Sequence, residues 1–234
     1  MARYFALVPA AGAGARFGSS TPKQYLSVNG RPLLWHALGR LCAHRGIERV
    51  FAVLSPGDIL FAHHPWHELS ERIEPLYVGG GARAESVLNG LRAVRQRMAG
   101  EDWILVHDAA RPCLQVEWID RLIEETGSDD VGGLLAVPVA DTLKQADASA
   151  RVTSTQPRSG LWRAQTPQMF RYGLLMRALE RADPAVTTDE ASAIEQLGLA
   201  PRLVMGSNLN IKVTYPEDLE LARLILMNTR ALGA

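Results

Sequence analysis

The segment that most constrains this 234-residue chain is its beginning, where an apolar run opens into a glycine-rich loop. Residues 4–9 have the pattern of a buried strand, and residues 10–18 continue as AAGAGARFG. Glycine lets backbone N–H groups turn toward a bound anion without obstruction by a Cβ atom. Arg16 and Lys23 add positive charge where a triphosphate would lie. This opening predicts an α/β fold that binds a nucleotide.

Spacing argues against two common phosphate-binding motifs. No stretch has the Walker pattern of Gly, four residues and Gly-Lys-Ser/Thr, so P-loop hydrolysis is not expected. Gly12, Gly14 and Gly18 miss the dinucleotide fingerprint by one residue, and the second predicted strand ends at residues 54–55 without a carboxylate for a ribose. A glycine-rich turn that serves only chain geometry stays an alternative, but the two cations favour phosphate binding.

Composition limits the compartment and the partners. With 47% hydrophobic residues the chain can bury a sizeable core, and its length favours a single domain over residues 1–234. Lys plus Arg equals Asp plus Glu at 25 each, so no net charge attracts nucleic acid or an anionic membrane. Cys42 and Cys113 form neither a metal-binding spacing nor a disulfide framework, and no segment approaches the ~20 apolar residues of a membrane span. We expect a cytoplasmic protein with no nucleic-acid or membrane partner.

Strand-like and helix-like segments alternate along the chain, as in stacked βαβ units. We expect a Rossmann-like, doubly wound α/β fold with a mostly parallel sheet. The predicted helices begin near Pro32 and cover residues 84–94 and about 117–125, and the predicted strands after the first are residues 50–54, 75–78, 103–106 and 134–137. Residues 103–106 are apolar throughout, as in a central strand buried on both faces, and they place Asp108 at that strand's carboxyl end.

Residues 138–160 have a different character and predict a projecting β-hairpin arm. Residues 139–145 and 151–156 are polar and rich in Thr and Val, with the small, polar residues 146–150 between them. A hairpin with so few apolar positions is marginal by itself, so packing against a second subunit would stabilise it. A loose surface hairpin on a monomer is the alternative.

The last third of the chain contains two predicted helix starts. Residues 187–190 (TTDE) and 214–217 (TYPE) each fit a capping box, in which threonine and glutamate satisfy backbone donors reciprocally. Residues 208–213 between them are predicted to be extended and to bring Lys212 to the edge of a helix start. The final helix is predicted to end near Asn228.

Loops at the carboxyl ends of strands converge on one crevice in a doubly wound sheet. Four elements are candidates to line it: the loop with Arg16 and Lys23, GGG at 79–81 leading to Arg83 and Ser86, HDAARP at 107–112, and NIKVT at 210–214. Together they closely resemble the 2-C-methyl-D-erythritol 4-phosphate cytidylyltransferase family of the sugar-nucleotide transferase superfamily. The resemblance runs through essentially the whole chain, including QTPQ at 165–168 and TDEA at 188–191.

The reaction that this resemblance implies belongs to the non-mevalonate isoprenoid pathway. The phosphate of methylerythritol phosphate attacks the α-phosphorus of CTP, giving a diphosphocytidyl product and pyrophosphate. Such a reaction needs electrostatic stabilisation more than covalent help, which fits a site richer in cations than in nucleophiles. By resemblance, Arg16 and Lys23 contact the triphosphate, and Lys23 and Lys212 stabilise the transition state.

The resemblance also implies the binding residues. Asp108 would hold Mg²⁺ or another divalent cation and contact substrate hydroxyls, while Arg111 and Thr188 would hold the methylerythritol moiety. Thr142 and Arg158 would contact the substrate phosphate of the neighbouring subunit, so a homodimer would share its sites by arm exchange. CTP would be bound by Ala10, Ala11, Gly12, Gly14, Gly80, Gly81 and Ser86.

The chain departs from the family pattern at two points. Relatives often carry Asp where this chain has Gly81, so a side-chain contact to the base is in doubt there. Residues 208–210 offer no acid beside Lys212, so a second carboxylate for the metal is not supported. His63, His64 and His67 have no evident fourth ligand and do not predict a metal site. His107 is expected to be a structural histidine at the end of its strand.

Two other functions stay open at this point. A cytidylyltransferase that acts on ribitol 5-phosphate or a related polyol phosphate would share nearly all the cations and differ only in the acceptor pocket. A non-catalytic nucleotide sensor would keep the crevice, although it would not need both Lys23 and Lys212.

Overall fold

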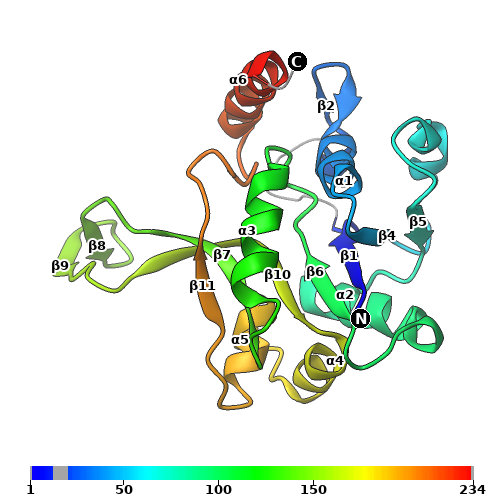
Figure 1. Cartoon of the computed structure of the whole chain (residues 1–234). Helices are drawn as coiled ribbons and strands as arrows, with labels where there is room; N and C mark the ends of the chain where they lie inside the picture. The colour runs from blue at the N-terminus through cyan, green and yellow to red at the C-terminus, as the bar shows by residue number, and fades with distance from the viewer. Residues whose placement is uncertain (1, 13–20, 233–234) are drawn as a thin grey trace.

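The computed structural model describes residues 2–12 and 21–232, and these residues build a seven-stranded sheet (Figure 1). Its strand order is β11-β7-β10-β6-β1-β4-β5. The strands are β1 (Tyr4–Pro9), β4 (Ile47–Val53), β5 (Ile73–Leu76), β6 (Trp103–Val106), β7 (Gly132–Pro138), β10 (Trp162–Arg171) and β11 (Arg202–Met205). Only β10 runs antiparallel to its neighbours, so the mostly parallel, doubly wound sheet is confirmed for the described residues.

Helices cover both faces of this sheet because the central strands are apolar on both sides. Successive side chains of a strand point to opposite faces. Ala6 and Val8 of β1 therefore pack on one side, and Phe5 and Leu7 pack on the other. The first side is covered by α1 (Leu33–Ala43) and α3 (Val116–Thr126), and the second by α2 (Arg83–Ala93), α4 (Tyr172–Arg181) and α5 (Glu190–Glu195).

A third apolar cluster holds the final helix, α6 (Pro216–Leu232), against the body. Ala222 and Leu226 of α6 pack with Val28 and Leu33 there. The helix continues past Asn228, where the sequence predicted its end.

Within the described ranges, no helix combines the length and the apolar sequence that a bilayer crossing requires. The short elements are β2 (Ser27–Val28), β3 (Arg31–Pro32) and the 3-10 helices η2 (Lys23–Tyr25), η3 (Phe61–His63), η4 (Trp66–Glu68) and η5 (Arg95–Arg97).

The predicted arm is an antiparallel hairpin that projects from the body (Figure 1). It consists of β8 (Leu143–Ala146) and β9 (Val152–Gln156). Residues 139–142 are not part of β8, although the sequence predicted a strand from residue 139. Val152 is 62% exposed, so the arm has little core of its own.

Both predicted capping boxes are wrong in detail. At α5 the cap is Asp189, whose carboxylate accepts from the Ser192 backbone N–H at 3.0 Å, while the Ser192 hydroxyl accepts from the backbone N–H of Asp189 at 3.1 Å. Before α6, the carboxylate of Asp218 accepts from the backbone N–H groups of Thr214 and Tyr215. Glu190 is not a cap because an arginine side chain, described below, engages its carboxylate in the interior.

The sequence also misplaced some strands. β5 covers residues 73–76 rather than 75–78, and residues 208–213 form turns and irregular structure rather than an extended segment. β10 was not predicted as a strand because polar residues interrupt its apolar pattern. Gln165, Thr166 and Gln168 are nevertheless buried, with their side chains hydrogen-bonded inside the protein.

His107 anchors the carboxyl end of β6 and is fully buried, which confirms the structural role expected for it. Its Nε2 lies 3.0 Å from the carbonyl oxygen of Arg111, which can only accept, so Nε2 carries the proton. Nδ1 therefore accepts from the hydroxyl of Thr166 at 2.9 Å, and that hydroxyl accepts from the Asp108 backbone N–H at 3.0 Å. A neutral His107 thus fixes the backbone of Asp108. Burial lowers the pKa of His107 to about 4.

This environment predicts a pH dependence of stability. The unfolded chain takes up a proton on His107 near the ordinary pKa of 6.5, whereas the folded protein resists protonation until about pH 4. Stability should therefore fall as the pH drops from 6.5 toward 4, with a contribution of up to ~1.4 kcal/mol per pH unit. Urea unfolding of the wild type and His107→Gln at several pH values would measure it. Parallel stability–pH curves for the two proteins would contradict the assignment.

Candidate active site

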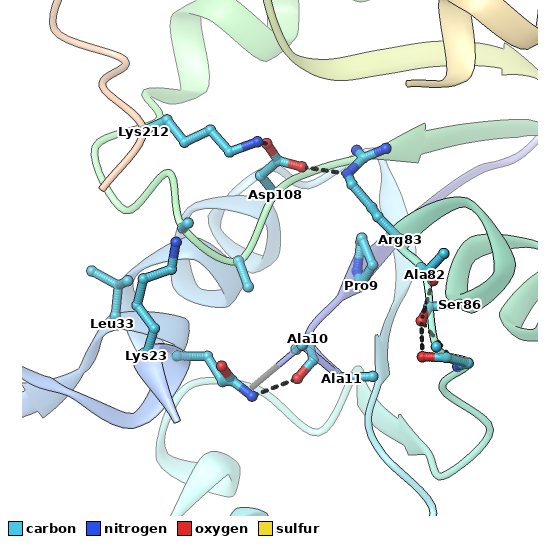
Figure 2. Close-up of a pocket in the computed structure, with 16 residues that line it drawn as sticks. Pro9, Ala10, Ala11, Lys23, Leu33, Ala82, Arg83, Ser86, Asp108 and Lys212 are labelled. Atoms are coloured by element: carbon cyan, nitrogen blue, oxygen red, sulfur yellow. Dashed lines mark hydrogen bonds and ion pairs between the residues drawn. The ribbon is translucent and has the colours of Figure 1, made fainter. Parts of the chain in front are cut away.

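A cavity of about 260 Å³ opens at the carboxyl ends of β1 and β6 (Figure 2). Most of the residues expected to bind CTP line it. The lining includes Ala10, Ala11, Gly12, Gly80, Gly81 and Ser86, together with Lys23, Asp108 and Lys212. Gly14 and Arg16, which the sequence also placed in this site, lie outside the described residues.

Hydrogen bonds fix the start of the glycine-rich loop. The backbone N–H of Ala10 donates to the Val53 carbonyl at 2.8 Å, and the side-chain amide of Gln24 donates to the Ala10 carbonyl at 2.7 Å. A Cβ atom at Gly79 would lie 2.2 Å from the Cβ of Ala11. Only glycine therefore lets the two loops approach this closely.

Side chains in the first turn of α2 accept hydrogen bonds from the backbone of the second glycine loop, residues 79–81. The backbone N–H of Gly80 donates to the Ser86 hydroxyl at 3.0 Å, and that of Gly81 donates to the carboxylate of Glu85 at 2.8 Å. Ser86 also donates to the Ala82 carbonyl at 3.0 Å. The N–H groups of Gly80 and Gly81 are thus paired with side chains of α2, and Gly80, Gly81 and Ser86 line the cavity.

The two lysines expected to act on the triphosphate line the same cavity. The chain has three lysines, and the third, Lys144, is on the arm. The ammonium group of Lys23 donates to the carbonyl of Val213 at 2.7 Å. Val213 directly follows Lys212, so Lys23 contacts the segment that carries the second lysine. Lys212 is 45% exposed at its side chain, and its ammonium lies 2.8 Å from Oδ2 of Asp108. The fold therefore brings together two cations from opposite ends of the chain.

Asp108 is a buried carboxylate held between cations. Oδ1 accepts from Nε of Arg83 at 2.9 Å, Oδ2 accepts from Lys212, and Nε of Arg111 lies 3.7 Å from Oδ2. Burial opposes ionisation of this group, but the charges of Arg83 and Lys212 hold the pKa of Asp108 well below its ordinary value of 3.8. The carboxylate therefore stays ionised across the range in which proteins work.

A second, polar cavity of about 150 Å³ adjoins the first. The two cavities share Arg83, Asp108 and Lys212. Arg111 and Thr188, which the sequence assigned to the acceptor substrate, line the second cavity. The Arg111 guanidinium is fixed by the carbonyls of Asn210, at 2.6 Å, and Ala164, at 3.3 Å. Two neighbouring compartments thus meet at one cluster of charges.

Thr142 and Arg158 do not join this cluster within one chain. Both are exposed on the arm and line neither cavity, and Arg158 donates to the carbonyl of Ala140.

His64, from the histidine-rich segment, stacks on Tyr25 at a ring distance of 5.8 Å and contacts Trp66 edge-on. That segment supports η2, which carries Lys23.

Two further charged residues belong to this site, and the sequence indicates no catalytic or binding role for either. Arg83 follows the glycine loop that lines the crevice, and Glu190 is part of the predicted helix cap. Their side chains form a two-pronged pair, with Nη–Oε distances of 2.6 and 3.0 Å. The positions are 107 residues apart, so no local pattern could have indicated the contact.

The side chains of this site provide only some of the ligands that a divalent cation needs. Within residues 2–12 and 21–232, no group of three or more His, Cys, Asp or Glu side chains is placed to hold a metal. Asp108 offers one ionised carboxylate at the junction of the two cavities. Mg²⁺ often uses one or two carboxylates together with substrate phosphate oxygens. The site therefore fits a cation that is bound mainly by a nucleotide.

Known proteins are similar to this chain in sequence and in fold. The model of the 2-C-methyl-D-erythritol 4-phosphate cytidylyltransferase family matches residues 4–228. Enzymes of that name from Dechloromonas aromatica and Nitrosospira multiformis are 58% and 55% identical to the chain, over 97% and 98% of it and 98% and 100% of their own lengths.

Solved structures agree with these relatives. A crystal structure of 4-diphosphocytidyl-2C-methyl-D-erythritol synthase superposes with a TM-score of 0.86 and 41% identity, covering 97% of this chain and 99% of its own. The Francisella tularensis 2-C-methyl-D-erythritol 4-phosphate cytidylyltransferase gives a TM-score of 0.81 at 33% identity, covering 96% and 100%. From the matched residues, the shared fold and the near-complete coverage, the chain belongs to the 2-C-methyl-D-erythritol 4-phosphate cytidylyltransferase family.

Proposed function

We propose that this chain transfers the cytidylyl group of CTP to 2-C-methyl-D-erythritol 4-phosphate. The products are 4-diphosphocytidyl-2-C-methyl-D-erythritol and pyrophosphate, as the names of its relatives indicate. The observation that carries the proposal is the meeting of Lys23 and Lys212 in one cavity with the ionised Asp108 (Figure 2). A site that only bound a nucleotide would not need two cations at the reacting phosphate.

In the proposed reaction an oxygen of the acceptor phosphate attacks the α-phosphorus of CTP. A new P–O bond forms in line with the α–β bridging bond, which breaks and leaves its electron pair on pyrophosphate. Negative charge grows on the α-phosphoryl oxygens and on the leaving group. The ammonium groups of Lys23 and Lys212, already held by Val213 and Asp108, would stabilise that charge without reorganising. The acceptor phosphate is ionised near neutral pH and needs no general base.

Each of the two cavities would bind a different substrate. Cytosine would bind near Ala10, Ala11 and the 80–86 loop, where hydrogen-bonding groups are backbone atoms and the Ser86 hydroxyl. At Gly81, which has no side chain, backbone atoms would contact the cytosine. The methylerythritol moiety would occupy the second cavity beside Arg111 and Thr188.

We also propose that Asp108 holds a divalent cation, most simply Mg²⁺, that arrives with the triphosphate. The support is the ionised carboxylate of Asp108, which lines a cavity together with Lys23 and Lys212. Each oxygen of Asp108 contacts one cation, Arg83 or Lys212, and keeps a second lone pair for a metal ion. When bound, such a cation offsets triphosphate charge and orients its oxygens.

The arm suggests a homodimer with shared sites. Thr142 and Arg158 are exposed, and they lie outside both cavities of their own chain. A partner's arm that reached the second cavity would supply the cation and hydroxyl for the acceptor phosphate. For the compartment we propose the cytoplasm, where the buried free thiols of Cys42 and Cys113 would stay reduced.

Removal of Lys23 should nearly abolish turnover. Lys23→Ala is expected to lower kcat by roughly 10²- to 10³-fold, because it deletes one preorganised charge aimed at the transition state. A pyrophosphate-release assay measures this, with circular dichroism to show that the variant folds. Arg97→Ala is the control, since Arg97 pairs with Glu74 near the amino end of β1. A kcat close to wild type for Lys23→Ala would contradict the proposed role.

Mixed dimers test the arm exchange. Lys23→Ala breaks the body of a site and Arg158→Ala breaks the arm, so each homodimer should be almost inactive. After the two variants are mixed and exchanged, half the dimers are mixed, and each has one intact site of two. About a quarter of wild-type activity should return. Mixing Lys23→Ala with Lys212→Ala should restore none, because both lysines belong to the same body. No recovery in the first mixture would refute shared sites.

The acceptor is tested by comparing two polyol phosphates at one saturating CTP concentration. We expect a higher kcat/KM for methylerythritol phosphate than for ribitol 5-phosphate. The opposite order would support the ribitol phosphate alternative. Tight CTP binding without pyrophosphate release with either acceptor would support a non-catalytic nucleotide sensor.

A further inference from the structure

A fully buried carboxylate next to the site has no part in the reaction described above. Glu190, the first residue of α5, has 0% exposure, and its two oxygens accept from both Nη atoms of Arg83. A two-pronged contact fixes the plane of the guanidinium as well as its position. A buried ion pair is often no more stabilising than apolar residues of the same volume. Stability is therefore a weak explanation for this pair.

Arg83 connects this buried acid to the reacting groups. It lines both cavities, and its Nε donates to Oδ1 of Asp108 at 2.9 Å (Figure 2). The other oxygen of Asp108 contacts Lys212 at 2.8 Å. Glu190, Arg83, Asp108 and Lys212 thus form a continuous chain of ionic contacts from the interior to the cavity.

We propose that Glu190 is a positioning residue for the transfer: it fixes Arg83, which holds Asp108 and, through it, Lys212 in the geometry that the reaction uses. The inference rests on the function proposed above. With both Nη atoms held, the Arg83 guanidinium cannot rotate away from Asp108 or toward a bound triphosphate. Without Glu190, the same guanidinium would be free to do both, and Asp108 and Lys212 would move with it.

Glu190→Gln is the direct test. Glutamine has nearly the same shape, but its amide nitrogen would face an N–H group of Arg83, so one of the two contacts is lost. We expect kcat to fall by roughly 10- to 100-fold, since a displacement of about 1 Å in a positioned group costs on that order. The KM for CTP should change less than kcat, because the hydrogen bonds that fix Ala10 and Gly80 in the two glycine loops do not involve Glu190. An unchanged kcat would overturn the inference.

Two further variants separate positioning from folding. Asp102→Asn is the matched control, because Asp102 is a buried carboxylate paired with Arg3 at the opposite end of β6. It should lower the melting temperature as Glu190→Gln does, but leave the kcat of folded enzyme unchanged. Glu190→Asp keeps the charge and should recover part of the lost kcat. A kcat for Glu190→Asp no better than that for Glu190→Gln would argue for a merely structural role.

A double-mutant cycle with Arg83→Gln tests the route of the effect. If Glu190 acts through Arg83, the double variant should be no slower than Arg83→Gln, whereas independent effects would multiply and refute the route. If Glu190→Gln does not fold, Arg83→Lys serves as the test variant in its place. Lysine cannot make the two-pronged contact with Glu190, so this variant should show the same loss in kcat. Wild-type kcat for Arg83→Lys would overturn the inference.

The wild-type assay separates this inference from the proposed function. If the wild type releases no pyrophosphate from CTP and methylerythritol phosphate, the proposed function fails. If the wild type is active and Glu190→Gln has the same kcat, only the positioning role fails.

Discussion

The site depends on one ionised carboxylate, that of Asp108, held where the buried strand β6 ends. Removing a carboxylate from water costs several kcal/mol unless charges and hydrogen bonds compensate. Arg83 and Lys212 contact it directly, and Arg111 lies 3.7 Å away. These cations come from α2, from the segment before α6 and from the turn after β6. One negative charge therefore joins three distant segments at a single point, and the neutral His107 fixes its backbone.

The charge balance of the cluster explains how cations gather before any anion is bound. Arg83, Arg111 and Lys212 would repel one another in a partly buried site. Asp108 lies beside all three and Glu190 pairs with Arg83, so three positive and two negative groups leave a single positive excess. Burial opposes the charge on Arg83, but Glu190 and Asp108 hold its pKa above the ordinary value. Lys23 adds a further positive charge at the cavity, so a phosphate enters a site that is cationic but already ordered.

The sequence predicted what chain order and local composition determine. Parallel strands end at one edge of a sheet, so the motifs around Lys23, Asp108 and Lys212 could be expected to meet. It could not reveal the pairing of Arg83 with Glu190, because that contact depends on how α2 and α5 pack on the same face. The TTDE motif suggested a cap instead, and Asp189 takes that part. β10 was missed because its buried glutamines and threonine resemble a polar loop until their internal hydrogen bonds are known.

Under the proposed arm exchange, the arm would connect assembly with substrate binding. Two strands with few apolar side chains are marginally stable in water, so packing against a second surface would stabilise β8 and β9. The second cavity has cations from the body of the chain, whereas Thr142 and Arg158 are displayed on the arm. Under the proposed arm exchange, the contact that orders the hairpin also completes the acceptor site. Burial of the exposed Val152 in that contact would then stabilise the dimer and, through the completed site, the binding of the acceptor phosphate.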